Sequence, residues 1–185
     1  MARSRRKARE AALRALYMLE VGKEEILEGL RDTVVSLQLT PEETEYAERI
    51  VLNCQIHGPE IDEKLAALIP DYDYSRIAVV DRNVLRIAAC EFLYEPGMPP
   101  AVTIDEAIEI ARKYSTAESG KFVNGVLASL LAQTAKAEWD PSMAEVEEKP
   151  EAEPEEAQAP VEEELSEEAA QELLKAGPWR LRAKE

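Results

Sequence analysis

The chain has 185 residues, enough for one domain or two small ones, and 45% of them are hydrophobic, so a buried core is possible. The formal net charge is -16, no apolar run approaches the length of a membrane span, and no apolar stretch typical of a secretory signal follows the first basic residues. These features argue against membrane and exported classes, and we expect a cytoplasmic protein.

The negative charge is concentrated near the carboxyl end. Residues 1–137 hold 17 basic and 22 acidic side chains, whereas residues 138–185 hold 5 basic and 16 acidic ones. The stretch "EVEEKPEAEPEEAQAPVEEE" has almost nothing to bury and is typical of disorder. We therefore predict a folded domain over 1–137 and an acidic, mostly disordered tail over 138–185. Ser166 as N-cap and the stop at 177–178 permit one short helix there, over 166–176.

Helical periodicity dominates the first part of the chain, and strand signals are nearly absent. Thr40 with Glu43, and Thr103 with Glu106, have the spacing of capping boxes. The predicted fold class is all-α, a bundle of seven helices with short connections. The predicted helices cover about residues 5–21, 23–37, 41–57, 60–69, 75–95, 103–115 and 119–136.

The long helix predicted over 75–95 is expected to be central. Ile77, Val84 and Phe92 share one face, while other apolar residues cover the remaining sides, as in a helix surrounded by others. Asp81 falls on the same side as Ile77. A carboxylate in that position needs a partner, either inside the fold or on another protein.

The stretch "SRRKAREAALRALY" makes the first helix strongly basic within an acidic chain. Its apolar stripe through Ala12 and Leu16, continued backwards, reaches Arg5 and Arg9. Because arginine is seldom buried without a partner, we expect the bundle to end near Ala8 and the first turns to project beyond it. The charges then belong either to an ordinary solvated terminus or to a helix that contacts RNA phosphates.

Four segments together resemble the family of the bacterial transcription antitermination factor NusB: "RRKAREAALRALY", "VLRIAACEFLY", "PAVTIDEAIEIARKYS" and "SGKFVNGVLASL". Their order and spacing are similar to that family over residues 3 to about 135. The resemblance implies seven helices in two small subbundles, transcription regulation without catalysis, and no cofactor or metal. It implies as partners boxA-type single-stranded RNA of nascent rRNA transcripts, the ribosomal protein NusE and the RNA polymerase antitermination complex, with neither a membrane nor a small-molecule substrate.

The resemblance also implies roles for individual residues. The predicted RNA-binding residues are Arg5, Arg6, Lys7, Arg9, Tyr17, Glu118, Ser119, Lys121, Phe122 and Asn124. The predicted NusE-binding residues are Asp81, Arg82 and Arg86. The family commonly has Asp where this chain has Glu118, which keeps the charge and changes its reach.

Plainer interpretations of the same residues stay open. Tyr17 is equally interpreted as a half-buried residue that packs on the bundle. For Phe122, which lies beside Val123, a core role is favoured over stacking on a base. The charges near Arg86 are equally intrahelical ion pairs. Lys121 and Asn124 point away from the buried face of the last helix, and both are expected to be exposed. A glycine within the last helix, Gly125, indicates either a close helix approach or tolerated slack.

An enzyme is disfavoured by the residues themselves. His57 is the single histidine and lies beside a predicted helix end, where such a side chain caps or is solvated. The "SGK" at 119–121 lacks the glycine spacing of a phosphate loop. Cys54 and Cys90 lack metal-type spacing and are predicted to be buried thiols. The main alternative function is a helical protein-interaction adaptor that binds no RNA itself.

Overall fold

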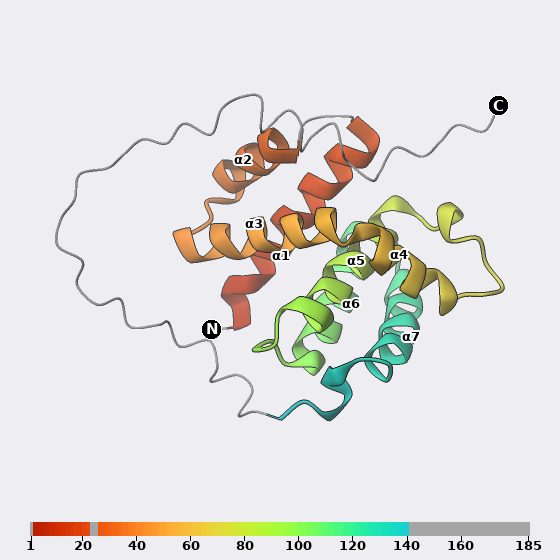
Figure 1. The fold of residues 1–185 in the computed structure, drawn as a ribbon. Helices are drawn as coiled ribbons and strands as arrows, with labels where there is room; N and C mark the ends of the chain where they lie inside the picture. The colour runs from red at the N-terminus through yellow and green to blue at the C-terminus, as the bar shows by residue number, and fades with distance from the viewer. Residues whose placement is uncertain (1, 23–25, 141–185) are drawn as a thin grey trace.

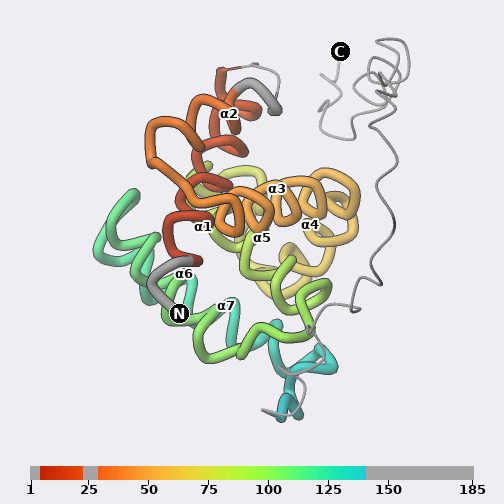
Figure 2. The backbone as a smooth tube through the Cα atoms, turned by 90° about the vertical axis from the view of Figure 1, so that its left-hand side faces the viewer, coloured from red at the N-terminus to blue at the C-terminus, as the bar shows by residue number. Residues whose placement is uncertain are grey.

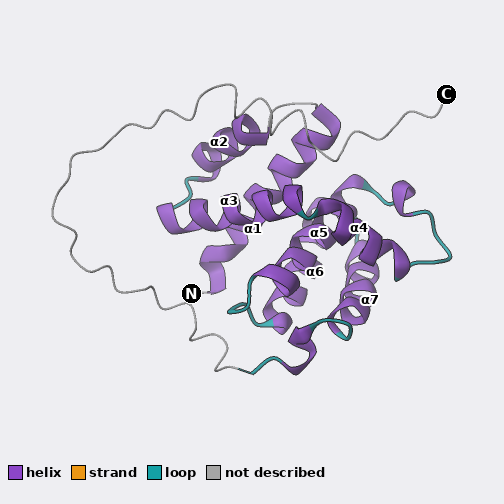
Figure 3. Cartoon of the chain, in the orientation of Figure 1, coloured by secondary structure: helices purple, strands orange, loops and turns teal. Residues whose placement is uncertain are grey.

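The computed structural model describes residues 2–22 and 26–140, which form seven α-helices without a strand (Figures 1 and 3). The α-helices are α1 (Ala2–Tyr17), α2 (Ile26–Leu37), α3 (Pro41–Ile56), α4 (Gly58–Ala67), α5 (Val79–Tyr94), α6 (Pro100–Tyr114) and α7 (Ser119–Leu131). Short π-helical and 3-10 segments cover Met18–Gly22, Tyr74–Arg76 and Ala135–Glu138. No helix in this part of the chain is both long and apolar enough to cross a membrane. The helix predicted over 166–176 lies outside the described residues.

The helices form two subbundles that meet at α5. Helices α1, α2 and α3 pack together, α4, α6 and α7 pack on α5, and α1 and α3 cross over onto α5 as well. The view in Figure 2, turned by 90° from Figure 1, shows α6 and α7 on the opposite side of α5 from α2. Every residue of α5 from 81 to 92 is buried, which confirms the predicted all-α fold and the central position of this helix.

The predicted start of α3 is confirmed in detail. The Thr40 hydroxyl accepts a hydrogen bond from the Glu43 amide at 3.3 Å, and the Glu43 carboxylate accepts one from the Thr40 amide at 2.9 Å. The capping box predicted at Thr103 is wrong. Helix α6 begins three residues earlier, at Pro100, and the Thr103 hydroxyl donates instead to Glu91 of α5. The Thr103 side chain therefore forms a tertiary contact with Glu91 instead of the helix cap that the local sequence pattern predicted.

The two cysteines lie in the core, as predicted. Cys54 of α3 and Cys90 of α5 are both free thiols without exposed surface, and their sulfur atoms are 2.9 Å apart. Burial raises the pKa of Cys90, because a thiolate there would lose its hydration. The pair therefore behaves as apolar filling between the two subbundles.

The end of the described chain closes over α5. The Lys136 ammonium donates hydrogen bonds to the carbonyl oxygens of Glu91 at 2.8 Å and Met98 at 2.6 Å, and also to that of Glu95. A lysine is well placed there, since the last carbonyls of a helix lack intrahelical donors. The Trp139 indole donates to the Pro96 carbonyl at 3.1 Å. A chain shortened after residue 140 keeps all of these contacts.

We expect Thr40→Ala to lower the free energy of unfolding by about 1 kcal/mol, because it removes the acceptor for a helix-end amide. Thr44→Ala is the matched control, since the Thr44 hydroxyl only donates to a carbonyl one turn earlier. Urea denaturation of the two variants measures the difference. Equal losses for both would contradict the capping role.

Candidate nucleic-acid interface

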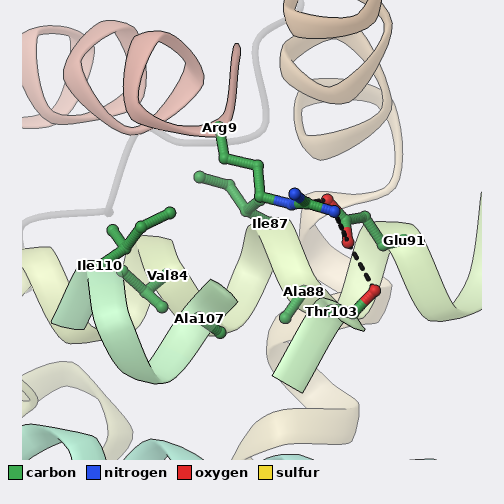
Figure 4. A pocket seen from close by; sticks show the side chains of 8 residues that line it. All are labelled: Arg9, Val84, Ile87, Ala88, Glu91, Thr103, Ala107 and Ile110. Atoms are coloured by element: carbon green, nitrogen blue, oxygen red, sulfur yellow. Dashed lines mark hydrogen bonds and ion pairs between the residues drawn. The ribbon is translucent and has the colours of Figure 1, made fainter. Parts of the chain in front are cut away.

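The inward side of the basic helix forms a buried ion pair. The Arg9 guanidinium donates from Nε and Nη2 to the two oxygens of Glu91 at 2.5 and 3.0 Å (Figure 4). The same carboxylate accepts hydrogen bonds from the hydroxyls of Tyr46 at 2.8 Å and Thr103 at 2.6 Å. Arg9 is 2% exposed and Glu91 has no exposed surface. Four hydrogen bonds thus tie α1, α3 and α6 to α5.

The Arg9 guanidinium stays charged despite its burial. Burial disfavours the guanidinium ion of Arg9, but the adjacent Glu91 carboxylate outweighs this effect, and the pKa of Arg9 is raised overall. Burial and the same carboxylate raise the pKa of Tyr46, so its hydroxyl keeps the proton that it donates. The prediction that the first turns of α1 project beyond the bundle from Ala8 is wrong, because Glu91 supplies the partner that a buried Arg9 requires. Arg9 has no access to a phosphate in this conformation.

The other early cations of α1 lie progressively further out. Arg5 is half-buried, with its guanidinium carbon 5.2 Å from the centre of the Tyr46 ring. Arg6 donates to both oxygens of Glu106 on α6 at 2.6 and 2.9 Å, and its side chain remains 43% exposed. Lys7 is exposed. One turn of helix therefore carries a packed, a paired and a solvent-facing cation.

A groove runs between α1 and α6 beside Arg6. It holds a hollow of about 340 Å³, lined by Arg6, Glu10, Glu109, Ile110, Arg112 and Lys113. The Lys113 ammonium donates to Glu10 at 2.8 Å, and the Arg112 guanidinium donates to Glu109 at 3.2 Å. Both cationic side chains are more than half exposed. Sequence reasoning missed these two residues, although basic side chains in the last turn of a helix were a visible signal.

The turn between α6 and α7 is fixed by hydroxyl groups and one buried carboxylate. The Ser119 amide donates to the Thr116 hydroxyl at 3.2 Å, and the Ser119 hydroxyl donates to Asp81 of α5 at 2.9 Å. At Gly120 an added Cβ would lie 2.8 Å from Arg112 Nε, so this glycine lets the arginine cross the start of α7. Ser119 is buried and positions the turn from within.

The remaining predicted RNA-side residues divide by exposure. Glu118, Lys121 and Asn124 are exposed, which confirms the expectation for Lys121 and Asn124. Phe122 is half-buried and packs against the core. Tyr17 is 41% exposed, but it ends α1 and lies about 16 Å along the helix axis from Arg6. The structure thus brings the α6–α7 turn close to the groove and leaves Tyr17 at the other end of α1.

The three predicted NusE-binding residues of α5 are buried and have partners on other elements. Arg86 donates to Asp62 of α4 at 2.7 and 2.8 Å and to Glu20 after α1 at 3.0 Å. Arg82 also pairs with Glu20, and one oxygen of Asp81 has no partner among the described residues. Burial disfavours the charge of Arg86, but Asp62 and Glu20 raise its pKa overall. The open alternative of intrahelical pairs is wrong, because the anions come from other helices.

No group of three or more His, Cys, Asp or Glu side chains within residues 2–22 and 26–140 has an arrangement that could hold a metal ion. His57 follows α3 and stacks on Tyr94, with ring centres 4.1 Å apart. The groove and the α6–α7 turn carry exposed guanidinium and ammonium groups, those of Arg112, Lys113 and Lys121, which suit an anionic partner.

Comparison of the sequence and the fold with known proteins shows which family the chain belongs to. The model of the NusB family matches residues 6–132. The chain belongs to the NusB family. Among curated relatives, the transcription antitermination protein NusB of Methylacidiphilum infernorum is 39% identical over 137 residues, which are 74% of this chain and 96% of that protein. The one of Desulforamulus reducens is 35% identical over 127 residues, or 69% of this chain and 89% of that protein.

Solved structures show the same fold. T. maritima NusB superposes with a TM-score of 0.67 at 34% identity, covering 76% of this chain and 96% of that one. A NusB chain from a crystal structure of antitermination factors NusB and NusE in complex with dsRNA has a TM-score of 0.66 at 28% identity, covering 72% and 99%. The acidic segment after residue 140 lies beyond the matched family region.

We expect Arg9→Ala to lower the free energy of unfolding by about 3–5 kcal/mol, because it strands a buried carboxylate. Lys7→Ala should change it by less than about 0.5 kcal/mol, since Lys7 is exposed. Arg9→Lys should recover part of the loss by restoring the charge without the two-pronged contact. Denaturant titration of the three variants checks this order, and an Arg9→Ala protein as stable as Lys7→Ala would contradict it.

Proposed function

We propose that this NusB-family protein is a transcription antitermination factor. In this proposal it binds boxA-type RNA of nascent rRNA transcripts together with the ribosomal protein NusE and promotes read-through by RNA polymerase. The relatives named above are transcription antitermination proteins, and one related chain was solved with NusE and dsRNA. The proposed setting is the cytoplasm, where transcripts are made, and the proposed role is regulatory rather than catalytic.

The observation that carries the proposal is the exposed cationic face of α1, α6 and α7. Its members are Arg6, Lys7, Arg112, Lys113 and Lys121. Phosphate oxygens accept from guanidinium and ammonium groups, and such contacts dominate the affinity for nucleic acids. A net acidic chain can bind RNA through this face, because screening limits the repulsion from charges more than about 10 Å away.

The pairs in the groove leave donors for RNA. Glu106 engages two nitrogens of Arg6, Nε and Nη2, while a guanidinium has five N–H donors in all. Each carboxylate therefore orients its cation and leaves further N–H groups for a phosphate. Of the residues predicted by resemblance, we keep Arg5, Tyr17, Glu118, Phe122 and Asn124 as proposed contacts. Arg9 and Ser119 we assign to the support of this face.

The NusE side is proposed at the amino-terminal end of α5. Asp81, Arg82 and Arg86 are all buried. The proposed role of Arg82 and Arg86 is to hold that end of α5 against Glu20 and Asp62. Asp81 holds it against the Ser119 hydroxyl at the start of α7. A partner would then dock on the surface that this network shapes. The charged network is largely desolvated, and removing one member leaves its partners unpaired.

The second candidate function is a protein-interaction adaptor without RNA affinity. One observation favours it: Arg6, Arg112 and Lys113 each pair with a carboxylate of the same chain, which lowers the net charge of the groove. Direct titration with RNA separates the two candidates, because the adaptor has no salt-dependent affinity for phosphates.

We expect the double variant Lys7→Ala/Lys121→Ala to bind boxA RNA more weakly than the natural chain, with a log–log salt slope reduced by roughly 1.4, or about 0.7 per lost phosphate contact. The matched control is Arg31→Ala/Lys64→Ala, which removes the same charge from α2 and α4, outside the proposed face. Fluorescence anisotropy with single-stranded and duplex boxA RNA at two salt concentrations measures both slopes.

For the natural chain, the proposal requires sequence-specific, salt-sensitive binding that strengthens when NusE is added. Absence of RNA binding with and without NusE would sink the antitermination proposal. Equal losses in the two double variants would show that net charge, rather than this face, sets the affinity.

A further inference from the structure

Helix α7 contains two glycines, and the fold explains only one of them. At Gly120 an added Cβ would lie 2.8 Å from Arg112 Nε and 3.0 Å from its Cγ, so a side chain there displaces the arginine. At Gly125 an added Cβ would meet no atom within 4 Å. No described glycine has a positive φ, so backbone conformation does not require a glycine at either position.

Gly125 therefore lowers the stability of α7, and no packing contact among the described residues requires a glycine there. It lies in the interior of the 13-residue helix Ser119–Leu131, where glycine is less favourable than alanine because it orders a freer backbone. The close helix approach that the sequence suggested as one alternative is absent from the described residues. What remains is either tolerated slack or the close approach of a molecule from outside.

The neighbours of Gly125 indicate which kind of molecule could approach. Lys121, one turn earlier, has a side chain that is 79% exposed, and Asn124 is exposed beside it. The other exposed residues of this helix, Ala128 and Ser129, carry small side chains. A protein partner would bury little apolar surface here, whereas a sugar–phosphate backbone would meet ammonium and amide donors.

We infer that Gly125 is an RNA-contact residue, at which the lack of a side chain lets the sugar–phosphate backbone approach the backbone of α7 beside Lys121 and Asn124. This inference rests on the proposed RNA-binding function. It extends the proposed face by one helical turn past the α6–α7 turn. It also predicts that stability and affinity change in opposite directions when Gly125 acquires a side chain.

The test compares Gly125→Ala and Gly125→Gln with Gly29→Ala in the full-length protein. Both residues introduced at Gly125 are strong helix formers, so the melting temperature should rise, by about 2–4 °C for alanine. RNA affinity should fall about threefold for alanine and tenfold or more for glutamine, as expected for the loss of one or more hydrogen bonds. In Gly29→Ala the new Cβ meets Met18 at an ordinary 3.6 Å. This control should be stabilised in the same way with unchanged RNA affinity.

Each other outcome overturns the inference. If the natural chain binds boxA RNA and Gly125→Ala binds it equally well, no contact requires the glycine, which the helix merely tolerates, and the proposed function stands. If Gly125→Ala lowers the affinity for NusE but not for RNA, this face belongs to a protein partner. A lower melting temperature would mean that the fold itself needs the glycine. A natural chain that binds no RNA would remove the proposed function and this inference together.

Discussion

The Glu91 carboxylate is the constraint on which the rest of the structure depends. It has no exposed surface and accepts hydrogen bonds from Arg9, Tyr46 and Thr103, which come from three different helices. A buried carboxylate is costly unless it is paired, so the stability of α5 depends on its contacts with α1, α3 and α6. The carbonyl of the same residue also receives Lys136, which ties the end of the described chain to this centre.

This constraint gives the basic helix two functions. Because successive residues are rotated by 100°, Arg9 turns toward α5 while Arg6 and Lys7 lie at or outside the edge of the bundle. The inward arginine fixes the position of α1 against α6, and that position creates the groove beside Arg6. A helix that is basic within an acidic chain thus joins the two subbundles through Arg9 and leaves Arg6 and Lys7 with exposed surface.

The patterns that depend on near neighbours in sequence predicted their part of the structure. The helices, the Thr40 cap, the burial of α5 and the two core thiols follow from periodicity and capping chemistry, which act over a few residues. Failures came where a partner lies far away in sequence. Arg9 and Glu91 are 82 residues apart, and no local rule pairs them.

Separation in sequence also explains why two other predictions differ from the structure. Thr103 had the spacing of a cap, but its hydroxyl is used by Glu91 of another helix. The charges near Arg86 were open to an intrahelical interpretation, but Arg86 pairs with Asp62 and Glu20 of other elements. Gly125 suggested either a close helix approach or tolerated slack, and an added Cβ there would meet no atom within 4 Å among the described residues. For Thr103 and Arg86 the residue type was informative, and only the tertiary structure identified the partner.

The most direct test of the central claim is a map of the residues that sense RNA. Titration of the ¹⁵N-labelled full-length protein with boxA RNA, followed by amide chemical shifts, provides it. The account predicts that the perturbed amides cluster in the first turns of α1, the last turn of α6 and the first two turns of α7, with Tyr17 as a separate contact at the far end of α1. Perturbations that cluster on α2, α3 and α4 instead would contradict it.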